Sequence, residues 1–164
     1  MNGLDFVAQI VATGQVNGTG IGADLEAVTQ AINVPFVDNM PGRRKTVLVR
    51  DYGLVEFTFN RTGETWVCGN FSAKLHRLET VAEVHADWHQ AHGVDLPARI
   101  TLAELQGQLA REYHLAEPVE RSQAGALYFR YPASNATVLV LDDPADQPIP
   151  PGDREVFSVS VHPE

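Results

Sequence analysis

The chain has 164 residues, of which 44% are hydrophobic and 20% charged, and its formal net charge is −9 at pH 7. This composition is ordinary for a globular protein, it contains no apolar run of about 18 residues that would cross a membrane, and its acidity argues against a nucleic-acid partner. The single cysteine, Cys68, excludes an internal disulfide, and the N-terminus shows no signal-peptide pattern, so we expect a cytoplasmic protein.

The first half of the chain, residues 1–77, predicts two helices followed by three strands. Apolar residues at helical spacing predict helices near Leu4–Ala12 and Ala23–Ile32, and Pro35 ends the second of them. Runs rich in β-branched and aromatic residues predict strands at residues 46–50, 54–60 and 65–76.

The second half, residues 78–164, predicts the same order of elements. Thr80 with Glu83, and Thr101 with Glu104, have the spacing of capping boxes and predict two helix N-termini. Three further strands are predicted near residues 127–131, 137–141 and 155–162.

The closing strands of the two halves share one pattern. Residues 71–76 and 157–162 both alternate apolar side chains with polar ones and both end in histidine. Such alternation indicates strands with one buried face and one open face. We therefore expect an α+β fold of two helix–helix–β–β–β pseudo-repeats, residues 1–77 and 78–164, in one compact unit. Helices should cover one face of the antiparallel sheet or sheets.

Charge is divided unequally between the halves. Residues 1–77 contain 7 acidic and 7 basic residues, whereas residues 78–164 contain 14 acidic and 5 basic ones. The acidic Asp142, Asp143 and Asp146 lie in a proline-rich segment that predicts an exposed loop. Because complementary charge accelerates encounter, we expect this acidic half to attract a basic partner through that loop.

The open sheet face is the second expected contact surface. A strictly alternating strand phase places aromatic, aliphatic and charged side chains together there, a mixture typical of protein interfaces. The expected contact residues are Arg50, Leu54, Glu56 and Trp66 in the first half, and Tyr128 and Leu139 in the second.

Two other groups of residues carry less specific signals. His85, His89 and His92 share one face of a predicted helix and could hold zinc or copper. They lack the glutamate of a zinc-protease helix and a nearby cysteine pair, so we expect no metal and no cofactor. Cys68 lies in a predicted strand with no helix N-terminus to lower its pKa, so we expect no catalytic residue.

The segment Leu48–Phe59 reads Leu-Val-Arg-Asp-Tyr-Gly-Leu-Val-Glu-Phe-Thr-Phe, and the third predicted strand ends at His76-Arg77-Leu78. Both segments resemble small immunity proteins of actinobacterial polymorphic toxin systems. The tandem architecture also resembles the β-lactamase inhibitor proteins of Streptomyces. The resemblance implies a protein that neutralises another protein, and it transfers no functional residues. Within the motif, Asp51-Tyr52-Gly53 predicts a hairpin turn.

Together these features predict a non-enzymatic protein-binding module, a cytoplasmic immunity protein that occludes the active surface of a cognate basic toxin, such as a nuclease. The alternative is a small-ligand binding or carrier protein that uses the groove between the repeats. A zinc-dependent enzyme built on the three histidines is the third hypothesis.

Overall fold

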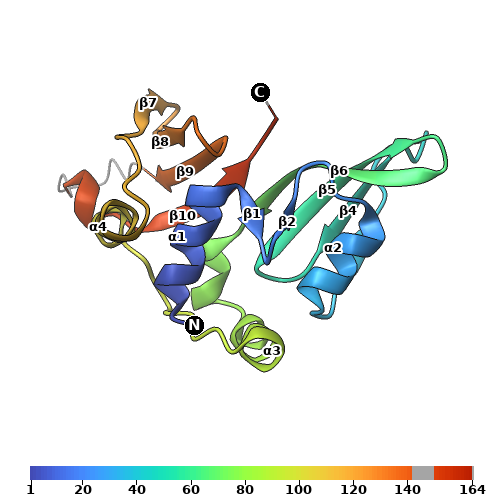
Figure 1. Ribbon diagram of the computed structural model, residues 1–164, viewed down its shortest axis with the longest axis horizontal. Helices are drawn as coiled ribbons and strands as arrows, with labels where there is room; N and C mark the ends of the chain where they lie inside the picture. The colour runs from blue at the N-terminus through green and yellow to red at the C-terminus, as the bar shows by residue number, and fades with distance from the viewer. Residues whose placement is uncertain (142–149, 164) are drawn as a thin grey trace.

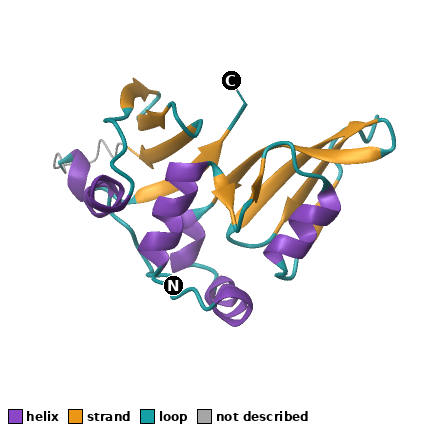
Figure 2. Ribbon diagram, viewed as in Figure 1, coloured by secondary structure: helices purple, strands orange, loops and turns teal. Residues whose placement is uncertain are grey.

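The computed structural model describes residues 1–141 and 150–163. This part of the chain contains four α-helices and ten β-strands, and eight of the strands form one antiparallel sheet (Figures 1 and 2). The predicted α+β class is therefore confirmed. No helix in the described part is long and apolar enough to cross a membrane.

The first half begins with helices and ends with strands. Its first elements are α1 (Gly3–Thr13), the short strands β1 (Gln15–Val16) and β2 (Thr19–Gly20), and α2 (Leu25–Ile32). Four strands of the large sheet and a 3-10 helix follow: β3 (Val37–Asn39), β4 (Val47–Asp51), β5 (Val55–Thr62), β6 (Thr65–Ala73) and η1 (Leu75–Glu79).

The second half has the same general order. Its helices are α3 (Ala82–His92) and α4 (Leu102–Glu112). Its strands, with one short 3-10 helix before the last, are β7 (Val119–Gln123), β8 (Ala126–Tyr131), β9 (Ala136–Leu141), η2 (Pro151–Asp153) and β10 (Val156–Val161).

A pair of central strands joins the two halves into one sheet. The strand order is β3-β4-β5-β6-β10-β9-β8-β7, so the last strand of each half lies in the middle. β6 and β10 run antiparallel, with Ser72 opposite Ser160 and Ala73 opposite Val159. The sheet is therefore continuous, and β3 and β7 form its two edges.

Helices cover one face of this sheet, as the alternation predicts. In Figure 1, α1 crosses β10 and α2 crosses the strands of the first half; α1 packs against β9 and β10, and α2 packs against β6. The alternating residues Val55, Phe57 and Phe59 are fully buried on this side. The rings of Phe57 and Phe59 pack with the ring of Phe71 in the core.

Local sequence signals are confirmed at some positions and wrong at others. Thr101 and Glu104 form the complete capping box of α4, and Gly53 adopts a φ of +79° in the predicted turn. The box predicted at Thr80 is wrong: the N-cap of α3 is Val81, and its side chain makes no capping bond. Buried Trp88 anchors this helix instead, because its Nε1 donates to the Tyr52 carbonyl at 3.1 Å.

The count of three strands in each half is also wrong. β3 and β7 are additional strands, and both lie at the edges of the sheet. Every residue in them is exposed, so neither shows the apolar alternation of a half-buried strand. Because these edge strands bury no side chain, they carry no apolar alternation, and hydrophobic patterning did not find them.

Candidate interaction surface on the open sheet face

The face of the sheet opposite the helices is defined by strand pairing. In the first half, β5 turns Glu56 and Thr58 toward this face, between buried Val55, Phe57 and Phe59. Thr58 pairs with Val49 of β4, so that valine lies on the same side. Glu56 thus occupies the open face, as expected from the sequence.

Arg50 does not lie on the open face. It pairs with buried Phe57 across β4 and β5, which places both side chains on the helix-covered side. There its guanidinium makes two 2.7 Å hydrogen bonds to Asp38, a third to Thr29, and lies 3.7 Å from the Phe36 ring centroid. The bond to Asp38 raises the pKa of Arg50, although burial opposes that shift. Arg50 therefore ties β3 and α2 to the sheet.

Trp66 and Leu54 are also displaced from the expected face. A bulge at Gly69 interrupts the pairing of β5 and β6, so the alternation counted back from Phe71 changes phase there. Cys68 consequently pairs with buried Phe59, and Trp66, two residues earlier, packs against the core. Leu54 lies in the turn before β5 and is fully buried.

The Asn60 side chain packs closely over Gly69. A Cβ atom at Gly69 would lie 2.3 Å from the Asn60 side-chain nitrogen and 3.8 Å from the Thr58 carbonyl oxygen. A larger residue at the bulge would therefore require the exposed Asn60 side chain to move.

The buried Cys68 thiol is expected to resist alkylation in the folded protein. Burial raises its pKa from 9.0 to about 12, so its thiolate, the reactive form, is suppressed until far above neutral pH. Iodoacetamide at a pH near 9 should therefore modify the urea-unfolded chain readily and the folded chain very slowly, as followed by mass spectrometry. Equal rates in the two states would contradict the buried placement.

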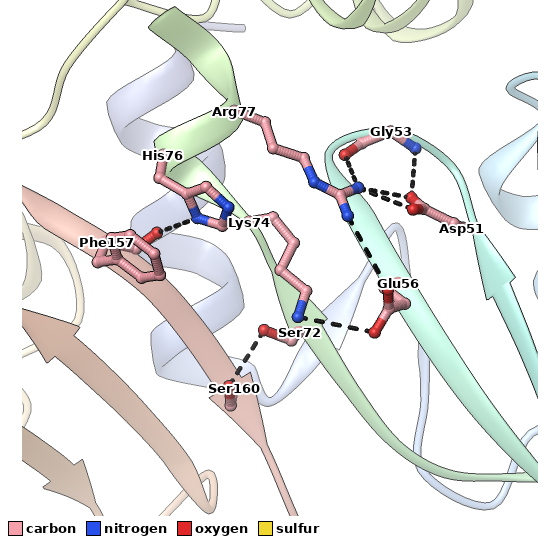
Figure 3. A network of polar contacts seen from close by, with 9 residues as sticks. All are labelled: Asp51, Gly53, Glu56, Ser72, Lys74, His76, Arg77, Phe157 and Ser160. Atoms are coloured by element: carbon pink, nitrogen blue, oxygen red, sulfur yellow. Dashed lines mark hydrogen bonds and ion pairs between the residues drawn. The ribbon is translucent and has the colours of Figure 1, made fainter. Parts of the chain in front are cut away.

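A polar network lies on the open face where β4 and β6 end and β5 begins (Figure 3). Arg77 Nη1 donates to both carboxylate oxygens of Asp51 at 2.8 and 2.9 Å and to the Gly53 carbonyl at 2.7 Å. Glu56 accepts two longer ion pairs, from Lys74 at 3.6 Å and from Arg77 at 4.0 Å. The two carboxylates and two cations of this network compensate one another, so the network has no net charge.

The seam between the halves continues this network. Ser160 Oγ donates to Ser72 Oγ at 3.1 Å across β10 and β6, and Figure 3 shows α1 behind these strands. These small hydroxyls leave the middle of the face shallow and polar.

In the second half of the chain, the open face carries a different set of side chains. Tyr128 lies opposite Arg121 of β7 and opposite Leu139 of β9. Its chain neighbours Leu127 and Phe129 are buried on the other side, so Tyr128 and Leu139 occupy the open face as expected. We call this surface the Tyr128 patch; its members lie on β7, β8 and β9 and are Val119, Arg121, Tyr128, Arg130, Leu139 and Leu141.

The Tyr128 patch is accessible. Val119 is 48% exposed and Leu141 is 49% exposed, both arginines are exposed, and Tyr128 is half-buried. Val119 and Arg121 belong to β7, which apolar patterning did not detect. No signal in the sequence would have identified them before the strand pairing was known.

The acidic residues expected to contact a partner are only partly located. Asp142, Asp143 and Asp146 lie outside the described residues. Elsewhere in the second half, the carboxylates lie on helices, in connections, or on the covered side of β7, where Glu120 pairs with buried Phe129. Among the described residues, the acidic charge of this half is therefore not on its open sheet face.

The three histidines of α3 do not converge on one point. His85 bonds to the Leu78 carbonyl at 2.8 Å, His89 lies 2.9 Å from Asp95, and His92 bonds to the Ile32 carbonyl. Within residues 1–141 and 150–163, no group of three or more His, Cys, Asp or Glu side chains is arranged to hold a metal ion.

One cavity lies where the two halves meet. It has a volume of about 360 Å³ and is lined by residues of η1, of the segment before α4 and of the segment from η2 into β10, and by Leu141 at the end of β9. His76 belongs to η1 and not to a strand as predicted; its ring stacks on Phe157 with centroids 4.1 Å apart. At the rim, Arg99 pairs with both Glu79 and Glu155, so its charge is compensated.

Comparison with known proteins identifies no family. No protein-family model matches the sequence, and no curated protein matches it. Among solved structures, the chain is similar to YjgB of Bacillus subtilis, a DUF4309 family protein, with 12% identity and a TM-score of 0.47 over 99% of this chain and 94% of that chain. The function of this chain must therefore be inferred from its own surfaces.

Proposed function

We propose that this chain is a non-enzymatic protein-binding module, an immunity protein that neutralises a cognate toxin by covering the toxin's active surface. The observation that carries the proposal is the accessible Tyr128 patch on a sheet face that the helices leave uncovered. Tyrosine and arginine among aliphatic side chains is the composition of interface hot spots. A solvated sheet face has no need of this composition.

The shape of the surface supports occlusion. An eight-stranded sheet presents a broad face, and the balanced network of Asp51, Glu56, Lys74 and Arg77 adds hydrogen-bonding groups on the first half of that face. Such a face suits another protein surface better than a small molecule, which binds in concave sites. The strand order, mirrored about β6 and β10, supports the proposal that the halves are pseudo-repeats, as in the architecture of β-lactamase inhibitor proteins.

The charge distribution supports a basic toxin as the partner, and the cysteine content supports the cytoplasm as the compartment. The net charge of −9 resides in residues 78–164, and its field extends beyond the contacts themselves. A basic toxin, such as a nuclease, would be attracted from a distance and then held by the open face. The single cysteine fits a reducing compartment.

The proposal is tested with a toxin encoded beside the gene of this chain. The purified chain should inhibit that toxin at equimolar concentration. Association should slow steeply with salt, because the Debye length shrinks from about 10 Å at 0.1 M to about 3 Å at 1 M. Replacing Asp142, Asp143 and Asp146 by lysine should lower the on-rate more than it raises the off-rate in surface-based kinetics.

Two results would contradict this function. Failure to bind or inhibit the neighbouring toxin would remove the immunity proposal. An on-rate that responds neither to salt nor to the triple replacement would exclude steering by the acidic segment. The control is Glu104→Gln, which changes the cap of α4 and leaves the acidic segment unchanged.

The second candidate is a small-ligand carrier, and the cavity between the halves favours it. Its volume of about 360 Å³ lies within the range of ligand sites. Its walls include the apolar Leu75, Ile100 and Val156, with the stacked His76 and Phe157 at one side. A ligand that raises the melting temperature of the wild type, with no effect on a cavity-filling Ala98→Phe variant, would support this candidate.

A further inference from the structure

We propose that the Tyr128 patch binds an extended protein segment that presents carboxylates beside apolar side chains. The inference rests on the proposed function, because it specifies the chemistry of the segment that docks on the open sheet face. It adds a short-range contact to the long-range attraction of a basic partner that was expected from the charge of the second half.

The arrangement of the patch follows from the strand register. Arg121 lies directly opposite Tyr128, and Val119 lies directly opposite Arg130. Opposed residues in an antiparallel pair have Cβ atoms about 5 Å apart, and residues two apart in a strand share a face. Arg121 and Arg130 are therefore neighbours of Tyr128 on this face, across to β7 and along β8, and Leu139 adjoins Tyr128 on β9.

The charges of these two arginines are uncompensated in the described part of the chain. Arg121 makes no ion pair or hydrogen bond there through its side chain, and Arg130 makes only a 3.4 Å bond to the Asn135 amide oxygen. Arg50, Arg77 and Arg99 each have carboxylate partners. The paired arginines stabilise the fold, whereas the two arginines of the patch remain available to a partner.

Within residues 1–141 and 150–163, no carboxylate on the same face of β7, β8 and β9 competes for them. The open-face residues of β7, β8 and β9 are apolar, hydroxyl-bearing, amide or basic, and they are Val119, Arg121, Gln123, Ala126, Tyr128, Arg130, Thr137, Leu139 and Leu141. Arginine binds carboxylates in a two-pronged geometry that is stronger than a bond between neutral groups. The complementary partner therefore carries Asp or Glu next to side chains that can pack on Tyr128 and Leu139.

The edge of the sheet explains why the segment should be extended. β7 is the last strand in the sheet order and pairs only with β8, and all five of its residues are exposed. An extended segment can add to such an edge through main-chain hydrogen bonds, with alternate side chains directed toward the open face. Its carboxylates would then lie next to Arg121.

Two arginines are too few for nucleic acid. Binding to a phosphate backbone depends on many cationic contacts, and the whole chain is strongly acidic. A toxin that is basic overall is attracted by the net negative charge of this chain. If its docking segment displays carboxylates, that segment can also bind Arg121 and Arg130. A metal-dependent nuclease has this distribution, since cations that hold phosphates surround carboxylates that hold the metal.

A random peptide library displayed on phage tests the inference on the intact chain. Selected 12- to 16-residue peptides should be enriched in Asp and Glu next to aromatic or aliphatic residues, and their affinity is measured by fluorescence polarisation. The double variant Arg121→Glu/Arg130→Glu should weaken binding by about 10-fold or more. The matched control Arg43→Glu/Arg44→Glu makes the same change of net charge at exposed residues of the β3–β4 connection and should leave affinity nearly unchanged.

The outcomes separate this inference from the immunity function. Selection of peptides without acidic enrichment, selection of no peptide, or equal weakening in the two double variants would overturn the acidic-segment inference. Unchanged circular dichroism and melting temperature establish that both variants fold. If acidic peptides bind through the patch but the neighbouring toxin does not, the inference stands and the immunity proposal fails.

Discussion

Replacing Tyr128 by alanine is expected to shorten the lifetime of the proposed complex with a toxin by about 30-fold, which corresponds to about 2 kcal/mol. Tyr128 is half-buried at the centre of its patch, so a docked partner would cover its ring completely. Burial of an aromatic anchor acts after encounter, and its loss therefore raises the off-rate and changes the on-rate little. Surface-based kinetics at constant salt measures both rates.

A second tyrosine provides the control for this substitution. Tyr113 follows α4 in the helical layer, away from the open face, and it is also half-buried. Tyr113→Ala should leave the off-rate unchanged. Equal effects of the two substitutions would show that the partner does not use the open face of the sheet.

Replacing Trp88 by alanine is expected to lower the free energy of unfolding by about 3–5 kcal/mol. Its side chain is fully buried, packs against Phe6 of α1 with ring centroids 5.4 Å apart, and donates a hydrogen bond to Tyr52. The substitution leaves a cavity between α1, α3 and the β4–β5 turn, and it removes the hydrogen bond. Thermal unfolding should shift downward by about 10 °C.

The conservative variant Trp88→Phe keeps an aromatic ring in the core. It loses the donor to the Tyr52 carbonyl and part of the buried indole volume, so about 1–2 kcal/mol of destabilisation is expected, less than for alanine. Urea unfolding monitored by circular dichroism measures both variants. A loss below about 1 kcal/mol for the alanine variant would mean that α3 does not depend on this anchor.

Patterns that depend on nearest neighbours in the chain were predictable. The alternation of Val55, Phe57 and Phe59 identified the buried side of β5, and the spacing of Thr101 and Glu104 identified the cap of α4. Helix capping and strand alternation require only a few consecutive residues, so their signals are complete in the sequence. The Thr80 cap failed because Thr80 is the C-cap of η1, a 3-10 helix that the sequence did not predict, so α3 begins one residue later with Val81 as its N-cap.

The contact surface was predictable only where the strand was regular. Tyr128 and Leu139 lie on uninterrupted stretches of β8 and β9, and their face was assigned correctly. Trp66 was assigned to the wrong face because the bulge at Gly69 adds one residue, and a shift of one residue reverses every side chain that precedes it. Arg50 was misplaced because its strand phase is set by pairing with Phe57, which the segment alone does not reveal.

The sequence by itself determined the α+β class, the division of charge between the halves and the buried side of the regular strands, because composition and side-chain periodicity carry this information locally. Only the tertiary structure decided that β6 and β10 join the halves, that β3 and β7 form the edges, and that Arg121 and Arg130 flank Tyr128. These features depend on hydrogen bonds between segments distant in the chain. Such pairing combines residues that no local pattern connects, and the candidate interaction surface arises from it.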